Sequence, residues 1–374
     1  MLEWNRLSRN YDMYGREIEP SSPLEKEIIK IGILAHSDGD GLTSAAIIQN
    51  RFPAATVYFS NAISLHKDVR FIVKQLGDSP DHLFIVDLAI NPRIANKILE
   101  ILKTLPENCQ IHYYDHHDLP DGFIGHFSSQ MTDIVHDVNT SASCATLKGI
   151  HQLEHPSLTG DCLTREYLIN NRTIAWLAAF GGISDHKENS ADVRSILDVY
   201  DQALLFYQAF SLKNACRKIQ NERAKRNIIR ALSVGILPSE IDSVREAAIQ
   251  SAREGMAAID FIKIHAATFR NITWIWNCPV GSAGMNAFMT ATLRNTRVGI
   301  ACHSNGLNVD MSIRKQHYQE FLNLHKITSK AVQCVGGQGG GSPDETGARI
   351  PEGKFKEFIR ELDGLIDAAV SRQD

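Results

Sequence analysis

The stretch IGILAHSDGDG, residues 31–41, joins an apolar run to a histidine and two aspartates directly behind it. A short apolar run of this composition predicts a buried β-strand. The segment GLTSAAII, residues 41–48, then predicts a helix that begins immediately after the polar residues. A strand that leads straight into a helix is the repeating unit of α/β folds, so this stretch predicts the fold class.

Three further apolar runs lead into acidic or histidine-bearing clusters. LFIV precedes Asp87, IHYY precedes the triplet 115–117, and AAFGGI, residues 178–183, precedes Asp185. We interpret each run as a strand of the same parallel sheet. Because the carboxyl ends of parallel strands meet at one edge, where α/β folds bind their ligands, the clusters are predicted to converge.

The residue types in these clusters favour a divalent cation. Carboxylates mixed with a few imidazoles suit Mn, Mg or Fe better than the thiolate-rich shells of structural zinc. In an extended segment, His36, Asp38 and Asp40 would share one face. Two metals held about 3.5–4 Å apart need a bridging carboxylate and several other ligands. The predicted metal ligands are His36, Asp38, Asp40, Asp87, His116 and Asp185.

The rest of the chain predicts further elements in the same α/β pattern. Helices are expected over 69–76 and 94–105, and another after residues 140–143, with Thr140 or Ser141 as its N-cap. Residues 191–261 have a helical pattern with a break near Gly235 and Pro238. Strands are expected over 273–276, 298–303 and 307–313, the last two joined by a hairpin turn at 304–306, and a final helix begins near Gly353.

These elements predict three parts of an α/β protein. Residues 1–200 form a parallel-sheet domain, 201–262 a helical connector, and 263–374 a smaller α/β domain. A length of 374 residues agrees with more than one core.

Composition limits the environment of the protein. Hydrophobic residues make up 43% and charged residues 22%, as in soluble globular proteins. The seven cysteines are scattered without a CxxC pair, which favours reduced thiols. No secretory leader or membrane-length apolar run is present in the sequence. We therefore expect a cytoplasmic protein with no membrane partner. The net charge of −4 restricts nucleic-acid binding to a local basic surface.

The clusters together resemble the four motifs of the DHH phosphoesterase superfamily. HSDGDG (36–41), Asp87, the DHH triplet (115–117) and Asp185-His186 match in order. The first motif is similar to that of the RecJ-like exonucleases. GGGSP (339–343), followed by GARIP (347–351), resembles the glycine-rich signature of the DHH-associated C-terminal domain. The resemblance covers nearly the whole chain and implies a parallel-sheet DHH domain followed by that smaller domain.

The resemblance also implies roles for individual residues. One of two divalent cations, Mn²⁺ or alternatively Mg²⁺, would be held by His36, Asp38 and Asp87. The other would be held by Asp40, Asp87, His116 and Asp185, with Asp87 shared. The catalytic residues would be His117, facing the scissile phosphate, and Asp115, which would orient a neighbouring histidine.

The second domain supplies candidate substrate-binding residues. Backbone amides of Gly339, Gly340 and Gly341 could contact a phosphate, and a flexible surface loop is the alternative interpretation. Family members carry a histidine where this chain has Ser342, which offers a hydroxyl and no positive charge. By the resemblance, Arg314 would contact substrate phosphate; a solvent-exposed strand residue is the alternative interpretation, and Arg349 ranks below Arg314.

A basic stretch in the predicted connector allows two interpretations. Its cations are Lys213, Arg217, Lys218, Arg223, Lys225, Arg226 and Arg230. They cannot all share one helix face, which is typical of a solvated connector. The alternative is a track for the phosphates of a longer strand.

The leading functional hypothesis is a metal-dependent phosphodiesterase, a hydrolase that shortens single-stranded DNA or RNA, or short oligonucleotides, to mononucleotides. A small-molecule phosphatase acting on a nucleotide bisphosphate, or a cyclic-dinucleotide hydrolase, is the second hypothesis. The third is a non-catalytic nucleic-acid-binding scaffold. The sequence leaves the oligomeric state open.

Overall fold

The computed structural model describes residues 29–77, 79–120, 122–157, 163–316, 319 and 321–371. Its first half is built on a five-stranded parallel sheet with the order β2-β1-β3-β4-β5. The strands are β1 (Ile31–Ala35), β2 (Thr56–Phe59), β3 (His82–Val86), β4 (Gln110–Asp115) and β5 (Asp133–His136). The predicted α/β fold class is confirmed.

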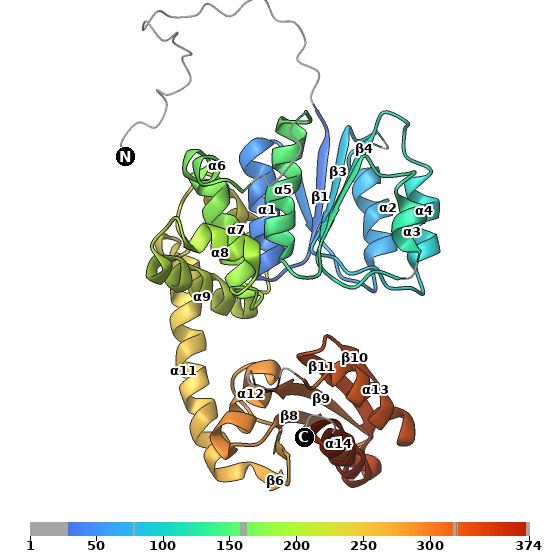
Figure 1. Ribbon diagram of the computed structural model, residues 1–374, viewed down its shortest axis with the longest axis vertical. Coiled ribbons are helices and arrows are strands. Elements are labelled where there is room, and N and C mark those ends of the chain that lie inside the picture. Colours follow the sequence, from blue (N-terminus) through green and yellow to red (C-terminus); the bar gives the residue numbers. More distant parts are fainter. Residues whose placement is uncertain are drawn as a thin grey trace, which may run out of the picture.

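Helices cover both faces of this sheet (Figure 1). One face carries α1 (Gly39–Arg51), α5 (Ala142–Glu154) and α7 (Arg172–Ser184), and the other α2 (Leu65–Gln75), α3 (Ala95–Leu102) and α4 (Phe123–Phe127). Successive residues of a strand point to opposite faces. Ile33 therefore lies in one apolar core and Leu34 in the other.

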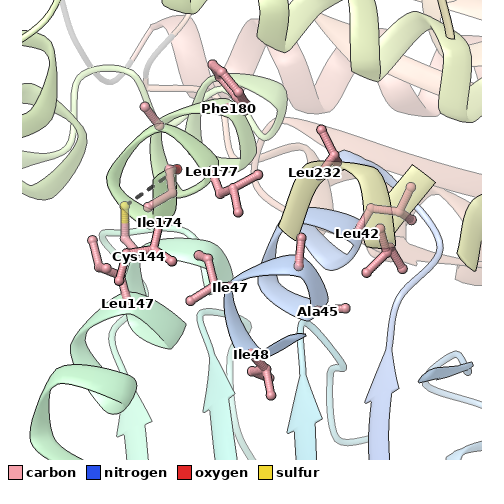
Figure 2. Close-up of a cluster of buried hydrophobic side chains, with 14 of the residues drawn as sticks. Leu42, Ala45, Ile47, Ile48, Cys144, Leu147, Ile174, Leu177, Phe180 and Leu232 are labelled. Atoms are coloured by element: carbon pink, nitrogen blue, oxygen red, sulfur yellow. Dashed lines mark hydrogen bonds between the residues drawn. The ribbon is translucent and has the colours of Figure 1, made fainter. Parts of the chain in front are cut away.

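Helix α1 is the centre of the larger core. Leu42, Ala45 and Ile47 pack among side chains of α5, α7 and α10 (Glu222–Ser233), which include Leu147, Leu177 and Leu232 (Figure 2). Asp38 caps the start of α1 by accepting a hydrogen bond from the amide of Gly41 at 3.1 Å. A Cβ atom at position 41 would lie 2.2 Å from the carbonyl oxygen of His36, so only glycine permits this turn.

The middle of the chain is helical, as predicted. It contains α6 (Arg165–Asn170), α8 (Ala191–Leu197), α9 (Gln202–Lys218), α10 (Glu222–Ser233), the 3₁₀ turn η1 (Pro238–Glu240) and α11 (Asp242–His265). Apolar residues of α9 and α10 belong to the larger core of the first sheet. Helix α11 then leads away from that core to the second sheet (Figure 1).

The second sheet is mixed and has the order β10-β11-β9-β8-β7-β6. Its strands are β6 (Ala267–Phe269), β7 (Ile272–Trp276), β8 (Val298–Ser304), β9 (Asn308–Lys315), β10 (Gln338–Gly341) and β11 (Glu345–Pro351). Helix α12 (Ala283–Arg294) packs on one face. On the other face lie α13 (Leu324–Cys334) and α14 (Phe355–Val370), which follows the 3₁₀ turn η2 (Glu352–Lys354). The predicted β8–β9 hairpin is confirmed.

Two local predictions and one alternative interpretation are wrong. The apolar run 178–183 lies inside α7 and is not a strand. Asp38 and Asp40 do not continue an extended segment, because Asp38 caps α1 and Asp40 lies in its first turn. The glycine-rich run is not a loop, since Gln338–Gly341 pairs with β11 as a strand. Ser141, one of the two predicted caps, does cap α5 by accepting from the amide of Cys144.

None of the helices in the described part of the chain is both long enough and apolar enough to span a lipid bilayer.

Close packing of α12 against β8 makes Gly299 a test of the second core. A Cβ atom there would lie 1.9 Å from the carbonyl oxygen of Ala287, in α12. Gly299→Ala should therefore push the helix away and destabilise the protein by about 1–3 kcal/mol, measured by urea unfolding. Gly364→Ala in α14 is the control, because no neighbouring atom lies within 4 Å of its Cβ position. It should raise stability by about 0.5–1 kcal/mol. Equal stabilities would contradict this account.

Candidate metal centre

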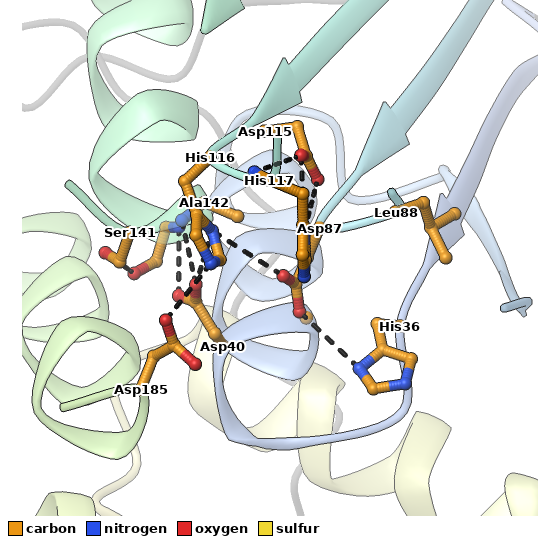
Figure 3. Close-up of polar contacts among 12 residues, drawn as sticks. His36, Asp40, Asp87, Leu88, Asp115, His116, His117, Ser141, Ala142 and Asp185 are labelled. Atoms are coloured by element: carbon orange, nitrogen blue, oxygen red, sulfur yellow. Dashed lines mark hydrogen bonds and ion pairs between the residues drawn. The ribbon is translucent and has the colours of Figure 1, made fainter. Parts of the chain in front are cut away.

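Three adjacent parallel strands deliver the predicted ligands to one edge of the first sheet. His36 follows β1, Asp87 follows β3, and the triplet 115–117 starts with the last residue of β4. Asp185, which caps the C-terminus of α7, joins them from the neighbouring helix (Figure 3). The predicted convergence of the clusters is therefore found, although one of them arrives on a helix.

Three of these side chains form a first potential ligand group. Ligand atoms of His36, Asp38 and Asp87 all lie within 4.8 Å of one another. Nδ1 of His36 lies 3.0 Å from a carboxylate oxygen of Asp38 and 3.8 Å from Oδ2 of Asp87. One imidazole thus faces two carboxylates, which suits a divalent cation that prefers oxygen and nitrogen ligands.

A second group lies on the other side of Asp87. It contains Asp40, His116 and Asp185, again with ligand atoms within 4.8 Å of one another. Nε2 of His116 lies 3.1 Å from Asp185 Oδ2, and its Nδ1 lies 3.7 Å from Asp40 Oδ2. Nδ1 of His116 is also 3.9 Å from Asp87 Oδ1. The two carboxylate oxygens of Asp87 therefore face different imidazoles, as a shared ligand would.

The backbone fixes the direction of the Asp87 carboxylate. Asp87 has φ of 55°, in the left-handed region that non-glycine residues rarely adopt. Its amide still donates to the carbonyl oxygen of Tyr114, at 3.1 Å, so the neighbouring strand holds the unusual conformation in place. Such strain costs about 1–3 kcal/mol and persists only where surrounding contacts compensate it.

Asp40 is held by the start of another helix. Its Oδ2 accepts from the amide of Ala142 at 2.8 Å and its Oδ1 from that of Ser143 at 3.0 Å, both in the first turn of α5. A carboxylate is favoured there by the free amides and the helix dipole. The cap at Ser141, which lies in this turn, thereby helps to position a candidate ligand 101 residues away in sequence, counting from position 40 to position 141.

The electrostatics of the centre favour a cation. Burial raises the pKa of Asp40 to about 6, together with the nearby charge of Asp185. Burial also raises the pKa of Asp87, and the charges of Asp38 and Asp40 add to this effect. For His116, burial lowers the pKa, but the hydrogen bond to Asp185 and the charge of Asp40 outweigh it and raise the pKa to about 9. The raised pKa values of Asp40, Asp87 and His116 favour protonation, which compensates the buried negative charge when no cation is bound.

The residues present fit two divalent cations. Asp87 Oδ2 and His116 Nδ1 are buried and have no hydrogen-bond partner among the residues that the structure describes. A buried polar atom without a partner is costly, and a cation in each ligand group would satisfy the atom that belongs to that group. The donor set contains only carboxylate oxygens and imidazole nitrogens, which are the ligands of Mn²⁺ and Mg²⁺ sites.

His117 and Asp115 form a pair beside the ligands, and ligand atoms of His117, Asp87 and His116 also lie within 4.8 Å of one another. Asp115 is fully buried and accepts from the amide of His117 at 2.6 Å. Its carboxylate also lies 3.1 Å from His117 Nδ1, which leaves Nε2 of that ring free of this contact. The sequence did not identify His136, whose Nε2 lies 2.6 Å from the carbonyl oxygen of His117 and fixes the same loop. The predicted orienting contact between Asp115 and a neighbouring histidine is present, and the catalytic roles of both residues stay predictions.

The second sheet brings the other candidates to one face. Arg314 in β9 is only 19% exposed in its side chain, and its guanidinium lies 2.9 Å from the carboxylate of Glu345 in β11. Arg349 is more exposed, and Asp310 accepts from it through both carboxylate oxygens. Gly339 and Gly347 line a shallow hollow together with Arg349.

The side chain of Ser342 forms hydrogen bonds within its own turn. Its hydroxyl accepts from the amides of Asp344 and Glu345, at 3.3 and 3.2 Å. The amide of Gly341 donates to Nδ1 of His325 in α13, at 3.2 Å. A histidine therefore lies beside the glycine strand, although it comes from a different element than the family pattern implies.

The interpretation of the basic stretch as a solvated connector is wrong for two of its members. Lys225 is 4% exposed, and its Nζ donates to the carbonyl oxygen of Ser37 at 2.5 Å. Lys213 donates to the carbonyl oxygen of Ser184 at 2.6 Å. Lys218 and Arg226, in contrast, form ion pairs with Glu254 and Glu222. No sequence signal distinguishes the first two lysines from the second pair.

Comparison with solved structures identifies the fold. A DHH-domain protein described as a member of a family of ribosomal proteins superposes with a TM-score of 0.65 at 14% identity, covering 90% of this chain and 86% of that one. RecJ from Thermus thermophilus in complex with Mn²⁺ gives 0.59 at 15% identity, over 91% of this chain and 52% of RecJ. A pGpG-specific phosphodiesterase, PggH from Vibrio cholerae, gives 0.50 at 14% identity, over 91% and 100%.

No protein-family sequence model matches the chain, and no curated protein matches it in sequence. At these low identities the structural matches show the fold alone. The fold that the resemblance to the DHH superfamily implies is confirmed, while the branch within that superfamily stays a prediction.

Metal binding should strengthen as pH rises. A cation must displace protons from His116, whose pKa is about 9, and from Asp40, whose pKa is about 6, because only the deprotonated groups are ligands. Mn²⁺ affinity should therefore rise from about pH 6 to pH 8, by about tenfold per pH unit for each proton displaced. Calorimetric titrations in two buffers with different ionisation enthalpies measure the protons released. His116→Gln should give a shallower pH dependence, and an equally steep one would argue against this assignment.

Proposed function

We propose that this chain, which has the fold of the DHH-domain proteins, is a metal-dependent phosphodiesterase that shortens single-stranded nucleic acid or short oligonucleotides to mononucleotides. The position of Asp87 carries the proposal. Its two oxygens face His36 and His116, so one buried carboxylate lies between two ligand groups. Every carboxylate and imidazole of the predicted set lies in one of these groups.

The proposed ligands divide between two cations. His36, Asp38 and Asp87 would hold one, and Asp40, Asp87, His116 and Asp185 the other. When bound, two such cations acidify a water for attack on phosphorus and neutralise the charge of the phosphate. Manganese is the proposed ion, because carboxylates with a minority of imidazoles suit it and because a structure of similar fold is a complex with Mn²⁺.

The chain's own residues would bind and orient the phosphodiester. His117, held through Nδ1 by the buried Asp115, would direct its other nitrogen to a phosphate oxygen. When protonated, this imidazole would donate a charge-assisted hydrogen bond to the oxygen on which negative charge develops.

Charges on the second sheet support an anionic substrate. Glu345, the partner of Arg314, also interacts electrostatically with Lys213 and Arg217 of α9. Three cations therefore interact with a single carboxylate of the second sheet. Their excess positive charge would attract the phosphates of a nucleotide, and a guanidinium can bind a phosphate through two parallel hydrogen bonds.

A dinucleotide hydrolase is the second candidate. It is favoured by PggH, which is described as pGpG-specific and which this chain matches over the full length of PggH. A scaffold without activity is disfavoured, because none of the predicted metal ligands is replaced. End-labelled RNA and DNA ladders of graded length with Mn²⁺ would distinguish the two enzymes. Products from pentanucleotides favour the leading proposal, and turnover of dinucleotides alone favours the second.

Asp87→Asn tests the central observation. The amide removes one charge and one ligand atom shared by both groups, so Mn²⁺-dependent release of nucleotides should fall by roughly a thousandfold or more. Asp260→Asn is the matched control, since its side chain is 79% exposed on α11. Near-normal activity of Asp87→Asn with Mn²⁺ would refute the proposed site.

Arg314→Met tests the role of the second sheet. Loss of a charged hydrogen bond of about 1.5–3 kcal/mol should raise KM for a pentanucleotide at least tenfold. The kcat for bis(p-nitrophenyl) phosphate, too small to need this contact, should change little. Arg349→Met should have a smaller effect on KM, because both carboxylate oxygens of Asp310 bind that guanidinium, whereas Glu345 contacts Arg314 through one. An unchanged KM in Arg314→Met would exclude this arginine from substrate binding.

A further inference from the structure

Two lysines of the helical middle segment donate hydrogen bonds to backbone carbonyl oxygens beside the candidate metal ligands. Lys225 of α10 donates to the carbonyl oxygen of Ser37, the residue between His36 and Asp38. Lys213 of α9 donates to the carbonyl oxygen of Ser184, the residue before Asp185. Each lysine thus contacts the chain directly beside a candidate ligand, and the two lysines contact different ligand groups.

These contacts are unusual for lysine. An ammonium group that leaves water pays a large desolvation penalty unless polar partners replace the water. Lys225 is 4% exposed; its ammonium contacts the Ser37 carbonyl oxygen and lies 6.0 Å from the centre of the Phe59 ring. Lys213 contacts the Ser184 carbonyl and Nε2 of His186, at 2.7 Å. Neither lysine has a carboxylate as a hydrogen-bond partner in these contacts, although Lys213 also interacts electrostatically with Glu345, Asp185 and Asp38.

The other ligands are already held by the first sheet and α5. Asp87 is fixed by its bond to β4, and Asp40 by the amides of α5. The lysines contact the chain where regular elements end: Ser37 lies between β1 and α1, and Ser184 is the last residue of α7. They therefore add, from α9 and α10, a further restraint at two positions that the first sheet does not hold directly.

We propose that Lys225 and Lys213 are positioning residues for the two cation subsites. Lys225 would hold His36 and Asp38, and Lys213 would hold Asp185. The inference rests on the ligand assignment of the proposed function and does not depend on the reaction or its substrate.

The direction in which Mn²⁺ affinity changes when a lysine is replaced distinguishes a positioning role from a purely electrostatic one. A lysine near a cation site repels the cation, so its removal should tighten Mn²⁺ binding if charge alone matters. If the lysine positions the ligands, its removal should weaken binding, as the loss of groups that orient metal ligands does, by about 10–100-fold. The two explanations therefore predict opposite shifts of the same constant.

Titration of the metal-free full-length protein with Mn²⁺ alone tests the proposal. Lys225→Met and Lys213→Met should each weaken one binding event at least tenfold. Lys218→Met is the matched control, because it lies in α9 beside Arg217 and pairs with Glu254. It should leave both binding events unchanged. Unchanged or tighter binding in both test variants would overturn the proposal and leave the proposed function standing. Absence of Mn²⁺ binding in the unsubstituted protein would overturn the proposed function itself, and the positioning role with it.

Paired variants assign each lysine to its subsite. In Asp38→Asn, the remaining Mn²⁺ affinity should fall with Lys213→Met and should not fall with Lys225→Met. In Asp185→Asn, the order should reverse. Equal effects in both backgrounds would overturn the assignment. Thermal unfolding of the metal-free variants checks the fold. If Lys225→Met does not fold, Lys213→Met decides the proposal alone, because the Lys213 side chain is only partly buried.

Discussion

Buried carboxylates that lie close together are the constraint on which the rest of this structure depends. Asp40, Asp87 and Asp115 are each at most 3% exposed. Charges of one sign at such depth are costly unless hydrogen bonds or cations compensate them. Asp115 is compensated by His117, and Asp40 by two amides of α5. Asp87 keeps a buried oxygen without a hydrogen bond among the described residues. The position of this carboxylate between two imidazoles explains why the centre suits cations.

The same constraint explains the close approach of α7 to α1. A Cβ atom at Gly181 would lie 2.4 Å from Asp40 Oδ1 and 2.2 Å from the Ser143 hydroxyl oxygen. Only a glycine lets the helix pass the anchored carboxylate at this distance. Because α7 passes so closely, Asp185, which caps its C-terminus, reaches His116. The close approach of Gly181 to Asp40 therefore determines both how α7 packs against α1 and where Asp185 lies in the candidate metal centre.

Much of the fold and the centre could be predicted because strand ends carry local signals. Apolar runs before Asp87 and before the triplet 115–117 are short and bounded, and they form strands as expected. The run before Asp185 was wrongly predicted to be a strand. It lies in α7, which is buried on nearly all sides and therefore lacks the pattern of apolar and polar residues that marks a surface helix. Lys213 and Lys225 could not be identified, because charged residues on a helix predict a solvated face. Their burial depends on tertiary contacts with Ser184 and Ser37.

The helical middle segment is therefore a structural part of the centre rather than a spacer. Apolar residues of α9 and α10 belong to the core that surrounds α1. That packing fixes the helices firmly enough for their lysines to reach two carbonyl groups of the centre. Helix α9 also carries Arg217, which interacts electrostatically with Glu345 of the second sheet. One face of α9 thus meets the candidate ligands through Lys213 and the candidate substrate face one turn later. Both interactions belong to one helix, so α9 links the segment beside Asp185 to the second sheet.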